Sequence, residues 1–479
     1  MKFRPALVGL LALSGIVMAD ISSLDLPDIG DSAGSVISPE HERRMGNAFL
    51  RQIRRQAPII YDPEVEAYIN SLGYKLASNS DRPQGFTFFV IDNPQINAFA
   101  GPGGVIGMNS GVILNSRNES ELAAVMAHEI AHVTQRHMAR MFERADQLSI
   151  PVAAAMIGAL ILGTQNSEAG AAALAATAGA NIQNQINFTR SNEQEADSIG
   201  MQILAHSGYN PRGMPGFFER LQQSSRYYQG NAPEFLRTHP LTNNRIADSQ
   251  ARAEEYPPMD VRDSQSYLLV RAKIRVHSFD NPRDAVKYFA EALETSEGDK
   301  DHLRYGYALA LTEADQFERA RAYLELLLKN HKNNVTFMNA LANVEHKRGN
   351  YSKSLAIYRE AYKYYPDYRP LVLYYSKTLL DAGQPEEART ILRRYGSSNE
   401  SDITYYNLLA QAEGQTGSQI ESGIAKAEYF YLLGDTELAI RRLQMALKQG
   451  TPDYYQQERI NARLAQLEYE RELEKDLKL

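Results

Sequence analysis

Hydrophobic residues recur at helical spacing along most of the chain, and the texture of this pattern changes twice. A region of mixed pattern runs to about residue 182, and a helical stretch follows it to about residue 256. The remaining half is helical and rich in tyrosine. Tyr256 is followed by Pro257 and Pro258, which stop a helix and favour an extended chain. We therefore expect one domain over residues 20–256 and a second over residues 257–479.

In the second half, small residues recur with a period of 34. They are Ala320, Ser354 and Ala388, and Ala285 lies 35 residues before the first of them. Three positions before these small residues stand Pro282, Phe317, Tyr351 and Pro385. Two positions earlier again, Gly349 and Gly383 fall where a turn between helices is expected. This period predicts tetratricopeptide-like helix pairs.

Toward the C-terminus the register of the repeats shifts. A unit around Gly434 and Ala439 is displaced by half a repeat, so we expect an extra helix near residues 403–410 and four to five helix pairs in all. Each pair has an apolar face that it cannot bury alone, so stacked pairs form an α-solenoid with a concave groove for peptides or partner domains. A plain helical bundle is the alternative. Tyrosines suit a recognition groove, although core packing is their commoner use.

The first 19 residues have the pattern of a cleavable signal peptide. Lys2 and Arg4 precede an apolar run over residues 6–18, and the small residues Val17 and Ala19 flank a cleavage position before Asp20. The run is shorter than the roughly 20 residues that span a bilayer. The chain has no cysteine, which excludes disulfides and a lipid-bearing cysteine and fits an oxidising compartment.

Charge and composition limit the classes of partner. The formal net charge of −7 becomes −9 without Lys2 and Arg4, which argues against a nucleic-acid partner and favours protein partners. Residues 151–180 are rich in alanine and glycine, but their apolar run is too short to cross a membrane. Two interpretations of this stretch stay open: helices in peripheral contact with a membrane, or a buried helical hairpin.

The helical pattern over residues 119–141 contains the sequence HExxH. Its histidines, His128 and His132, are four positions apart and project from one face of the helix, so both imidazoles can reach one zinc ion. Glu129 is turned toward the open side of that metal. The flanking residues 122–127 are apolar, which predicts a buried helix, and two unpaired histidines would be costly there.

A catalytic zinc ion needs a third protein ligand and leaves its fourth position to water. Glu193 and Asp197 share one face of a second predicted helix, so one of them can bind the metal while the other orients the site or handles a proton. Glu195 points away from that face and is expected to be a solvated charge. Three acidic residues within five positions more often lie on a protein surface than in a functional site. They are candidates here because HExxH precedes them.

These motifs resemble the HtpX-like and CaaX-prenyl-protease-like zinc peptidases, in which HExxH precedes a helix with ExxxD. The resemblance implies His128, His132 and Glu193 as the ligands of one zinc ion per chain, with Glu129 as general base and Asp197 as a catalytic acid. Residues 97–104 are similar to the strand segment ahead of the zinc helix in that family. It therefore implies a mainly α chain: an α+β zincin-like metallopeptidase domain with a small sheet, followed by the α-solenoid.

With its signal peptide and repeats, the whole chain is similar to members of this family in the Gram-negative periplasm. That resemblance implies quality control and assembly of outer-membrane β-barrel proteins, with misfolded or stalled barrels and their assembly machinery as partners. It also implies that His239, in a loop-like stretch, is an inhibitory fourth zinc ligand. A solvated loop histidine is the alternative.

We expect the enzyme to hydrolyse peptide bonds with metal-activated water, with Glu129 accepting the proton. Unfolded chains are the expected substrates, bound by strand addition to the glycine-rich segment after Phe99. The alternative is a chaperone or adaptor with a structural zinc site, and the two roles can coexist. Glu129 favours the enzyme, because a structural site has no use for a carboxylate beside the metal.

Overall fold

The computed structural model describes residues 38–81, 85–144, 182–227, 235–396, 402–449 and 451–476. The predicted signal peptide and the stretch over residues 151–180 lie outside the described residues. The described part of the chain is mainly helical and contains one three-stranded sheet, which confirms the predicted fold class.

The sheet consists of β1 (Thr87–Ile91), β2 (Ala98–Ala100) and β3 (Val105–Asn109) in the order β1-β3-β2. β1 pairs with β3 in parallel, and β2 pairs with β3 in antiparallel fashion, so β2 forms one edge of the sheet. Between β2 and β3 the chain turns through η1 (Pro102–Gly104). Gly103 and Gly104 have φ angles of 66° and 76° there, which L side chains rarely adopt.

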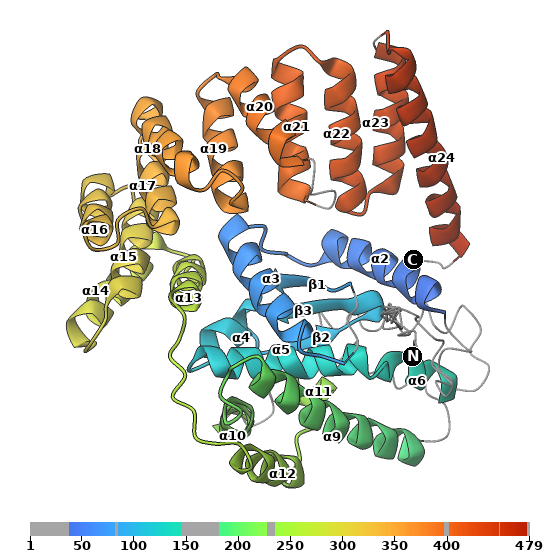
Figure 1. Cartoon of the computed structure of the whole chain (residues 1–479), viewed down its shortest axis with the longest axis vertical. Coiled ribbons are helices and arrows are strands. Elements are labelled where there is room, and N and C mark those ends of the chain that lie inside the picture. Colours follow the sequence, from blue (N-terminus) through green and yellow to red (C-terminus); the bar gives the residue numbers. More distant parts are fainter. Residues whose placement is uncertain are drawn as a thin grey trace, which may run out of the picture.

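The N-terminal part of the chain packs helices on both faces of this sheet (Figure 1). Side chains of a strand alternate between its two faces, and here they enter two hydrophobic clusters. Phe88 and Val90 pack with α3 and α5, whereas Phe89 and Ile91 pack with α2. The helices of this part are α2 (Pro39–Gln56), α3 (Pro63–Ala77), α4 (Ser110–Asn115), α5 (Glu119–Thr134), α6 (His137–Arg144), α9 (Ile182–His206), α10 (Gly213–Tyr227), α11 (Phe235–Thr238) and α12 (Asn243–Glu254).

The C-terminal half is an array of antiparallel helices, as the 34-residue period predicts. Pro282, Phe317, Tyr351 and Pro385 are each the first residue of a second helix, and the four small residues of the period are fully buried. The helices are α13 (Gln265–His277), α14 (Pro282–Thr295), α15 (Asp301–Glu313), α16 (Phe317–Asn330), α17 (Val335–Lys347), α18 (Tyr351–Tyr364), α19 (Arg369–Asp381), α20 (Pro385–Gly396), α21 (Ile403–Gln415), α22 (Gln419–Leu432), α23 (Thr436–Gln449) and α24 (Tyr454–Asp476).

These described helices form six consecutive pairs, whereas the sequence indicated four to five. The helix expected near residues 403–410 is present as α21, but it continues the register instead of interrupting it. Ser422 lies 34 residues after Ala388, and its hydroxyl donates to the Ala410 carbonyl at 2.7 Å. Ser354 makes the equivalent bond to Ala342, also at 2.7 Å. Helix α23 begins 33 residues after α21, and α24 begins 35 residues after α22, so the described helices contain no extra half-repeat and the predicted shift of register is wrong.

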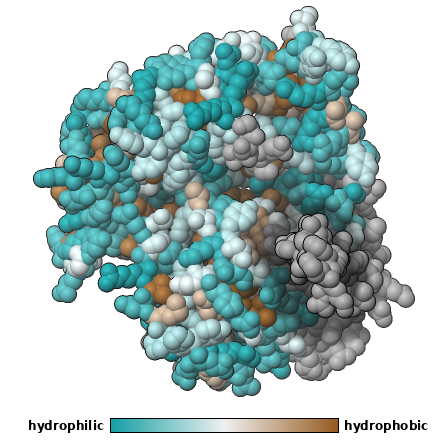
Figure 2. All heavy atoms as spheres, in the orientation of Figure 1, coloured by the Kyte–Doolittle hydropathy of each residue, from teal (hydrophilic) through white to brown (hydrophobic). Residues whose placement is uncertain are grey.

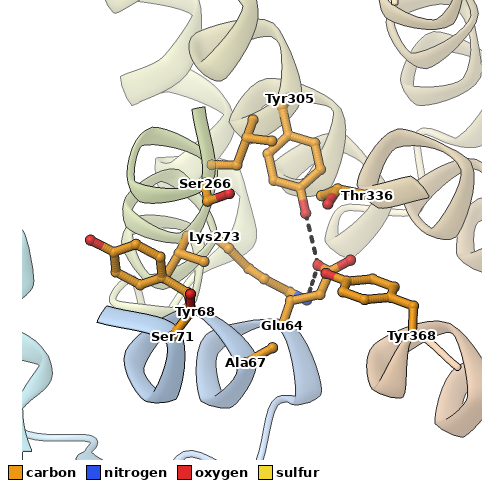
Figure 3. Close-up of a pocket in the computed structure, with 11 residues that line it drawn as sticks. Glu64, Ala67, Tyr68, Ser71, Ser266, Lys273, Tyr305, Thr336 and Tyr368 are labelled. Atoms are coloured by element: carbon orange, nitrogen blue, oxygen red, sulfur yellow. Dashed lines mark hydrogen bonds and ion pairs between the residues drawn. The ribbon is translucent and has the colours of Figure 1, made fainter. Parts of the chain in front are cut away.

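The repeat array curves over the N-terminal part and contacts it at several places (Figure 1). In the first two pairs of the array, Lys273 of α13 and Tyr305 of α15 donate hydrogen bonds at 2.8 Å and 3.2 Å to Glu64 in the first turn of α3 (Figure 3). These residues line a cavity of about 190 Å³ between α3 and the repeats. At the far end, Arg54 and Arg55 of α2 donate to backbone carbonyls between α22 and α23.

Helix α13 belongs to both halves of the molecule. One side of it, with Tyr267, Val270 and Ile274, is part of the hydrophobic core of the N-terminal part, and the other side packs against α15. Its N-cap, Ser264, donates to Glu119 at the start of α5 at 2.9 Å. The first repeat helix therefore supports the HExxH helix directly.

The molecular surface in the view of Figure 2 is mainly hydrophilic, with hydrophobic residues scattered in small groups. Within the described ranges, no helix has both the length and the apolar character that crossing a bilayer requires.

Candidate metal centre

The two histidines of HExxH lie on α5, which is buried along almost its whole length. Asn118 caps the helix by accepting from the Glu121 backbone N–H, and apolar residues surround the following turns. His128 and His132 stand one turn apart, and their Nε2 atoms face each other at 3.1 Å. The predicted convergence of both imidazoles on one point is present.

Helix α9 brings Glu193 to the same point. Its carboxylate oxygens lie 3.4 Å from His128 Nε2 and 3.5 Å from His132 Nε2. The close approach of α9 to α5 depends on Gly200, because a Cβ there would stand 3.1 Å from the backbone of His128. Such a distance is tighter than an ordinary contact.

Asp197, the second acid of ExxxD, lies behind the convergence point. Its Oδ1 is 3.1 Å from His128 Nδ1, the nitrogen that faces away from the other donors. Arg245 of α12 holds the same carboxylate through Nε at 2.7 Å and a terminal nitrogen at 2.8 Å. Asp197 therefore faces His128 from behind as an ion-pair partner and does not enter the donor cluster.

His239 is buried in the centre and is not a solvated loop residue. It directly follows α11, and its ring stacks on Phe235 with a centroid distance of 4.6 Å. Its Nδ1 lies 3.1 Å from Glu193 and 3.3 Å from His128 Nε2, and its Nε2 lies 3.5 Å from Glu129.

His128, His132, Glu193 and His239 offer four donor atoms that all lie within 4.8 Å of one another. Metal–nitrogen bonds of about 2.0–2.1 Å in a tetrahedron require donors roughly 3.3 Å apart. Five of the six donor pairs are separated by 3.1 to 3.5 Å, and the sixth pair, His132 with His239, lies within 4.8 Å. The donor set and its spacing therefore fit a small tetrahedral metal ion.

Glu129 lies beside these donors with no exposed surface, and neither carboxylate oxygen has a hydrogen-bond partner among the described residues. Burial raises the pKa of this carboxyl. A buried carboxylate without partners is costly unless a further group, such as a water molecule, completes its hydrogen bonds. This is the arrangement expected of a group that receives a proton from water.

The two α5 histidines differ in their electrostatic surroundings. Burial opposes a charge on His128, but contacts with Asp197 and Glu193 outweigh it and raise the pKa to about 10. Burial lowers the pKa of His132 well below the usual histidine range, so this imidazole is neutral. Burial also lowers the pKa of the neighbouring His137, to about 4.

The sequence did not indicate two groups that the structure brings to the centre. Arg245 contacts both acids of ExxxD and donates to the Pro240 carbonyl at 2.8 Å. An isolated arginine in a predicted helix carries no pattern that could have identified it. The second group is His137 with Glu195, which the sequence placed in solvent. Glu195 instead lies 3.2 Å from His137 and 2.8 Å from Arg140.

A helix with HExxH, a second helix with ExxxD and a buried Glu129 whose oxygens make no hydrogen bond to the described residues define a metallopeptidase centre. Residues 63–253 match the model of peptidase family M48. Residues 279–335, 305–369 and 346–412 match models of tetratricopeptide repeats.

Curated relatives extend over nearly the whole chain. It is 37% identical over 468 residues to the beta-barrel assembly-enhancing protease of Escherichia coli K12, which covers 96% of this chain and 95% of that protein. A putative beta-barrel assembly-enhancing protease of Vibrio cholerae is 37% identical over 458 residues, or 95% of this chain and 94% of that protein. The mitochondrial metalloendopeptidase OMA1 of Schizosaccharomyces pombe is 33% identical over 171 residues, or 35% of this chain and 46% of that protein. The chain belongs to the beta-barrel assembly-enhancing protease family of M48 metallopeptidases.

Proposed function

We propose that this chain is a zinc endopeptidase with His128, His132 and Glu193 as ligands of one zinc ion and Glu129 as general base. One observation carries the proposal: donors from two helices converge at tetrahedral spacing beside a buried carboxylate whose oxygens make no hydrogen bond to the described residues. Two imidazoles and a carboxylate are a ligand set typical of catalytic zinc. Asp197 then serves as the acid that orients His128, and Arg245 keeps it ionised.

A zinc ion bound here would polarise the scissile carbonyl and lower the pKa of a water molecule to about 7. Glu129 would accept the proton of that water on a free carboxylate oxygen and pass it to the leaving amine. Burial, which raises the pKa of Glu129, makes the carboxylate a stronger proton acceptor. The apolar surroundings of α5 keep bulk water away from this transfer.

The edge strand β2 offers a place for an extended substrate. Gly101 donates its N–H to the Val105 carbonyl, and Asn109 donates to Asn97, so the alternate residues Ala98 and Ala100 turn their backbone groups to the free edge. β2 also packs against α5. A substrate chain added to this edge would be held by backbone bonds, which require no particular side chains. Unfolded chains meet this condition.

His239 is the candidate for a fourth, inhibitory zinc ligand in the same centre. As a fourth protein ligand it would close the tetrahedron and occupy the position that water needs. Four protein ligands are also typical of structural zinc, which would make the chain a chaperone or adaptor. Glu129, a buried carboxylate beside the donors that makes no hydrogen bond to the described residues, favours a latent peptidase over a structural site.

The names of the relatives and the repeats supply the biological setting that we propose. The chain would act in the periplasm after cleavage of residues 1–19, in quality control and assembly of outer-membrane β-barrel proteins. Misfolded or stalled barrels and their assembly machinery would be the partners, docked through the repeats. Peripheral membrane contact through residues 151–180 is part of the same hypothesis, and no nucleic-acid partner is expected.

Metal analysis combined with digestion of casein tests the enzymatic proposal. The wild type should contain one zinc ion per chain, and Glu129→Gln should retain it while its proteolysis falls by about 10²–10⁴-fold, because the base is lost and the ligands remain. His128→Ala with His132→Ala should abolish zinc binding. Stoichiometric zinc in that double variant, or unchanged digestion by Glu129→Gln, would refute the assignment.

A further inference from the structure

Behind His132, on the side away from the metal donors, three side chains form a hydrogen-bonded chain. His132 Nδ1 lies 2.8 Å from His137 Nδ1, and the two rings are nearly perpendicular. His137 Nε2 lies 3.2 Å from Glu195 Oε2. Arg140 donates to that same oxygen at 2.8 Å. His132 and His137 are largely buried, whereas Glu195 and Arg140 are each about one third exposed.

The backbone takes an unfavourable conformation to place His137 there. In a continuous helix, a residue five positions after His132 would lie about 140° around the axis, away from its ring. Instead α5 ends at Thr134, and Arg136 adopts φ 51° before α6 begins at His137. Left-handed geometry is disfavoured for a residue with a long side chain, and such strain persists only where the surroundings impose it. Here it returns an imidazole to the ligand that α5 carries.

The direction of each hydrogen bond follows from the two ends of the chain. Glu195 is paired with Arg140 and can only accept, so His137 Nε2 carries a proton and donates it. His137 Nδ1 then has a lone pair and must accept from the Nδ1–H of His132. That leaves the lone pair of His132 on Nε2, the atom that faces His128 and Glu193.

We propose that His137, oriented by Glu195 and Arg140, is a positioning residue that fixes the tautomer and the ring orientation of His132. The inference rests on the proposed zinc site and adds a role to residues that are not the defining positions of HExxH or ExxxD. It also makes the two α5 histidines unlike each other. His128 is backed directly by the carboxylate of Asp197, whereas a neutral imidazole stands between His132 and its carboxylate.

Three substitutions of His137 separate positioning from packing. Leucine removes both nitrogens, glutamine places its amide near the position of Nε2, and asparagine places its oxygen near the position of Nδ1. Zinc affinity of the full chain is measured by competition with a chelator, using Zn²⁺ alone. We expect leucine and glutamine to weaken zinc binding by about 10–100-fold, as loss of an outer hydrogen-bond partner does. Asparagine should restore most of the affinity, because it still accepts from His132.

Two controls accompany these variants. His206→Leu removes an exposed imidazole of α9 and should leave zinc affinity unchanged. Thermal unfolding of the metal-free variants shows whether the fold persists. Should His137→Leu fail to fold, Glu195→Ala decides instead, because its side chain is partly exposed and its loss should still weaken zinc binding several-fold.

The inference is overturned if His137→Leu binds zinc as tightly as the wild type, if asparagine and leucine weaken binding equally, or if Glu195→Ala changes nothing. In each of these cases the wild type still binds zinc, so the proposed metallopeptidase stands. A wild type that binds no zinc would remove the proposed function and this inference together.

Discussion

The two histidine donors of α5 are each held from behind by a residue of another element. Asp197 and Arg245 stand behind His128, and His137 stands behind His132. Arg245 also donates to the carbonyl of Pro240, the residue after His239. A single guanidinium thus connects the ExxxD helix with the segment that carries the fourth donor. Such outer contacts set the orientation and basicity of metal ligands.

His239→Ala should raise basal proteolysis several-fold. Three protein ligands leave a position for water, whereas a fourth imidazole removes it until the segment moves. Zinc affinity should fall only modestly, since His128, His132 and Glu193 remain. Digestion of casein and zinc content, measured on the same preparations, test this expectation.

For comparison, His206→Ala changes an exposed histidine outside the centre and should alter neither quantity. Unchanged activity and zinc content in His239→Ala would retire the inhibitory role. Lost activity with zinc retained would assign His239 to substrate binding or to the transition state.

At the scale of elements, the centre depends on how closely α9 packs on α5. Ala196 and Met201 of α9 are fully buried, and Gly200 lies directly against the backbone of His128. A helix pair separated by a larger side chain could not bring Glu193 to within 3.5 Å of both histidines. Gly200 is not itself a metal ligand, but it therefore controls the distance between Glu193 and the two histidines.

Gly200→Val should push the two helices apart, weaken zinc binding and lower the free energy of unfolding by about 1–3 kcal/mol, the usual cost of overpacking. Gln202→Val serves as the matched control, because it places the same side chain on an exposed position of the same helix. Chelator competition and denaturant unfolding measure both effects. Equal behaviour of the two variants would contradict the close-packing argument.

At the scale of the whole molecule, the repeats and the peptidase part share buried polar contacts. Lys273 of α13 lies 2.8 Å from Glu64 (Figure 3). It also lies 2.7 Å from Asp62, to which Tyr374 of α19 donates at 3.0 Å. Arg369 of α19 adds a bond to Glu66 at 2.8 Å. The first turn of α3 therefore occupies the concave side of the array, so the two halves are coupled mechanically.

Lys273→Met should reduce the free energy of unfolding by about 3–5 kcal/mol, because Asp62 and Glu64 would remain buried without their cation. Lys287→Met serves as the control. Lys287 is exposed on the next helix and lies 3.9 Å from Glu291, so its loss should change the free energy of unfolding little. Denaturant unfolding of the two variants compares them. A loss no larger in Lys273→Met than in Lys287→Met would show that this network does not stabilise the assembly.

Much of the fold and part of the site could be predicted from local spacing. The small residues at intervals of 34 located the second helices at Pro282, Phe317, Tyr351 and Pro385. The predicted register was wrong at Ser422. Gly417 and Gly434 both occupy turns between helices, and the prediction aligned Gly434 with the turn glycines of the repeat. A sequence period can be recognised where successive repeats make the same contacts with the same residue types.

The sequence by itself determined which residues share a helix face: His128 with His132, and Glu193 with Asp197. Backbone geometry fixes positions four residues apart, so no distant contact is needed. Only the tertiary structure decided how these faces meet. His239 lies 111 residues from its neighbour His128, and the left-handed turn at Arg136 brings His137 back to His132. Contacts between elements arise from packing, which depends on shape at positions such as Gly200 and leaves no periodic trace in the sequence.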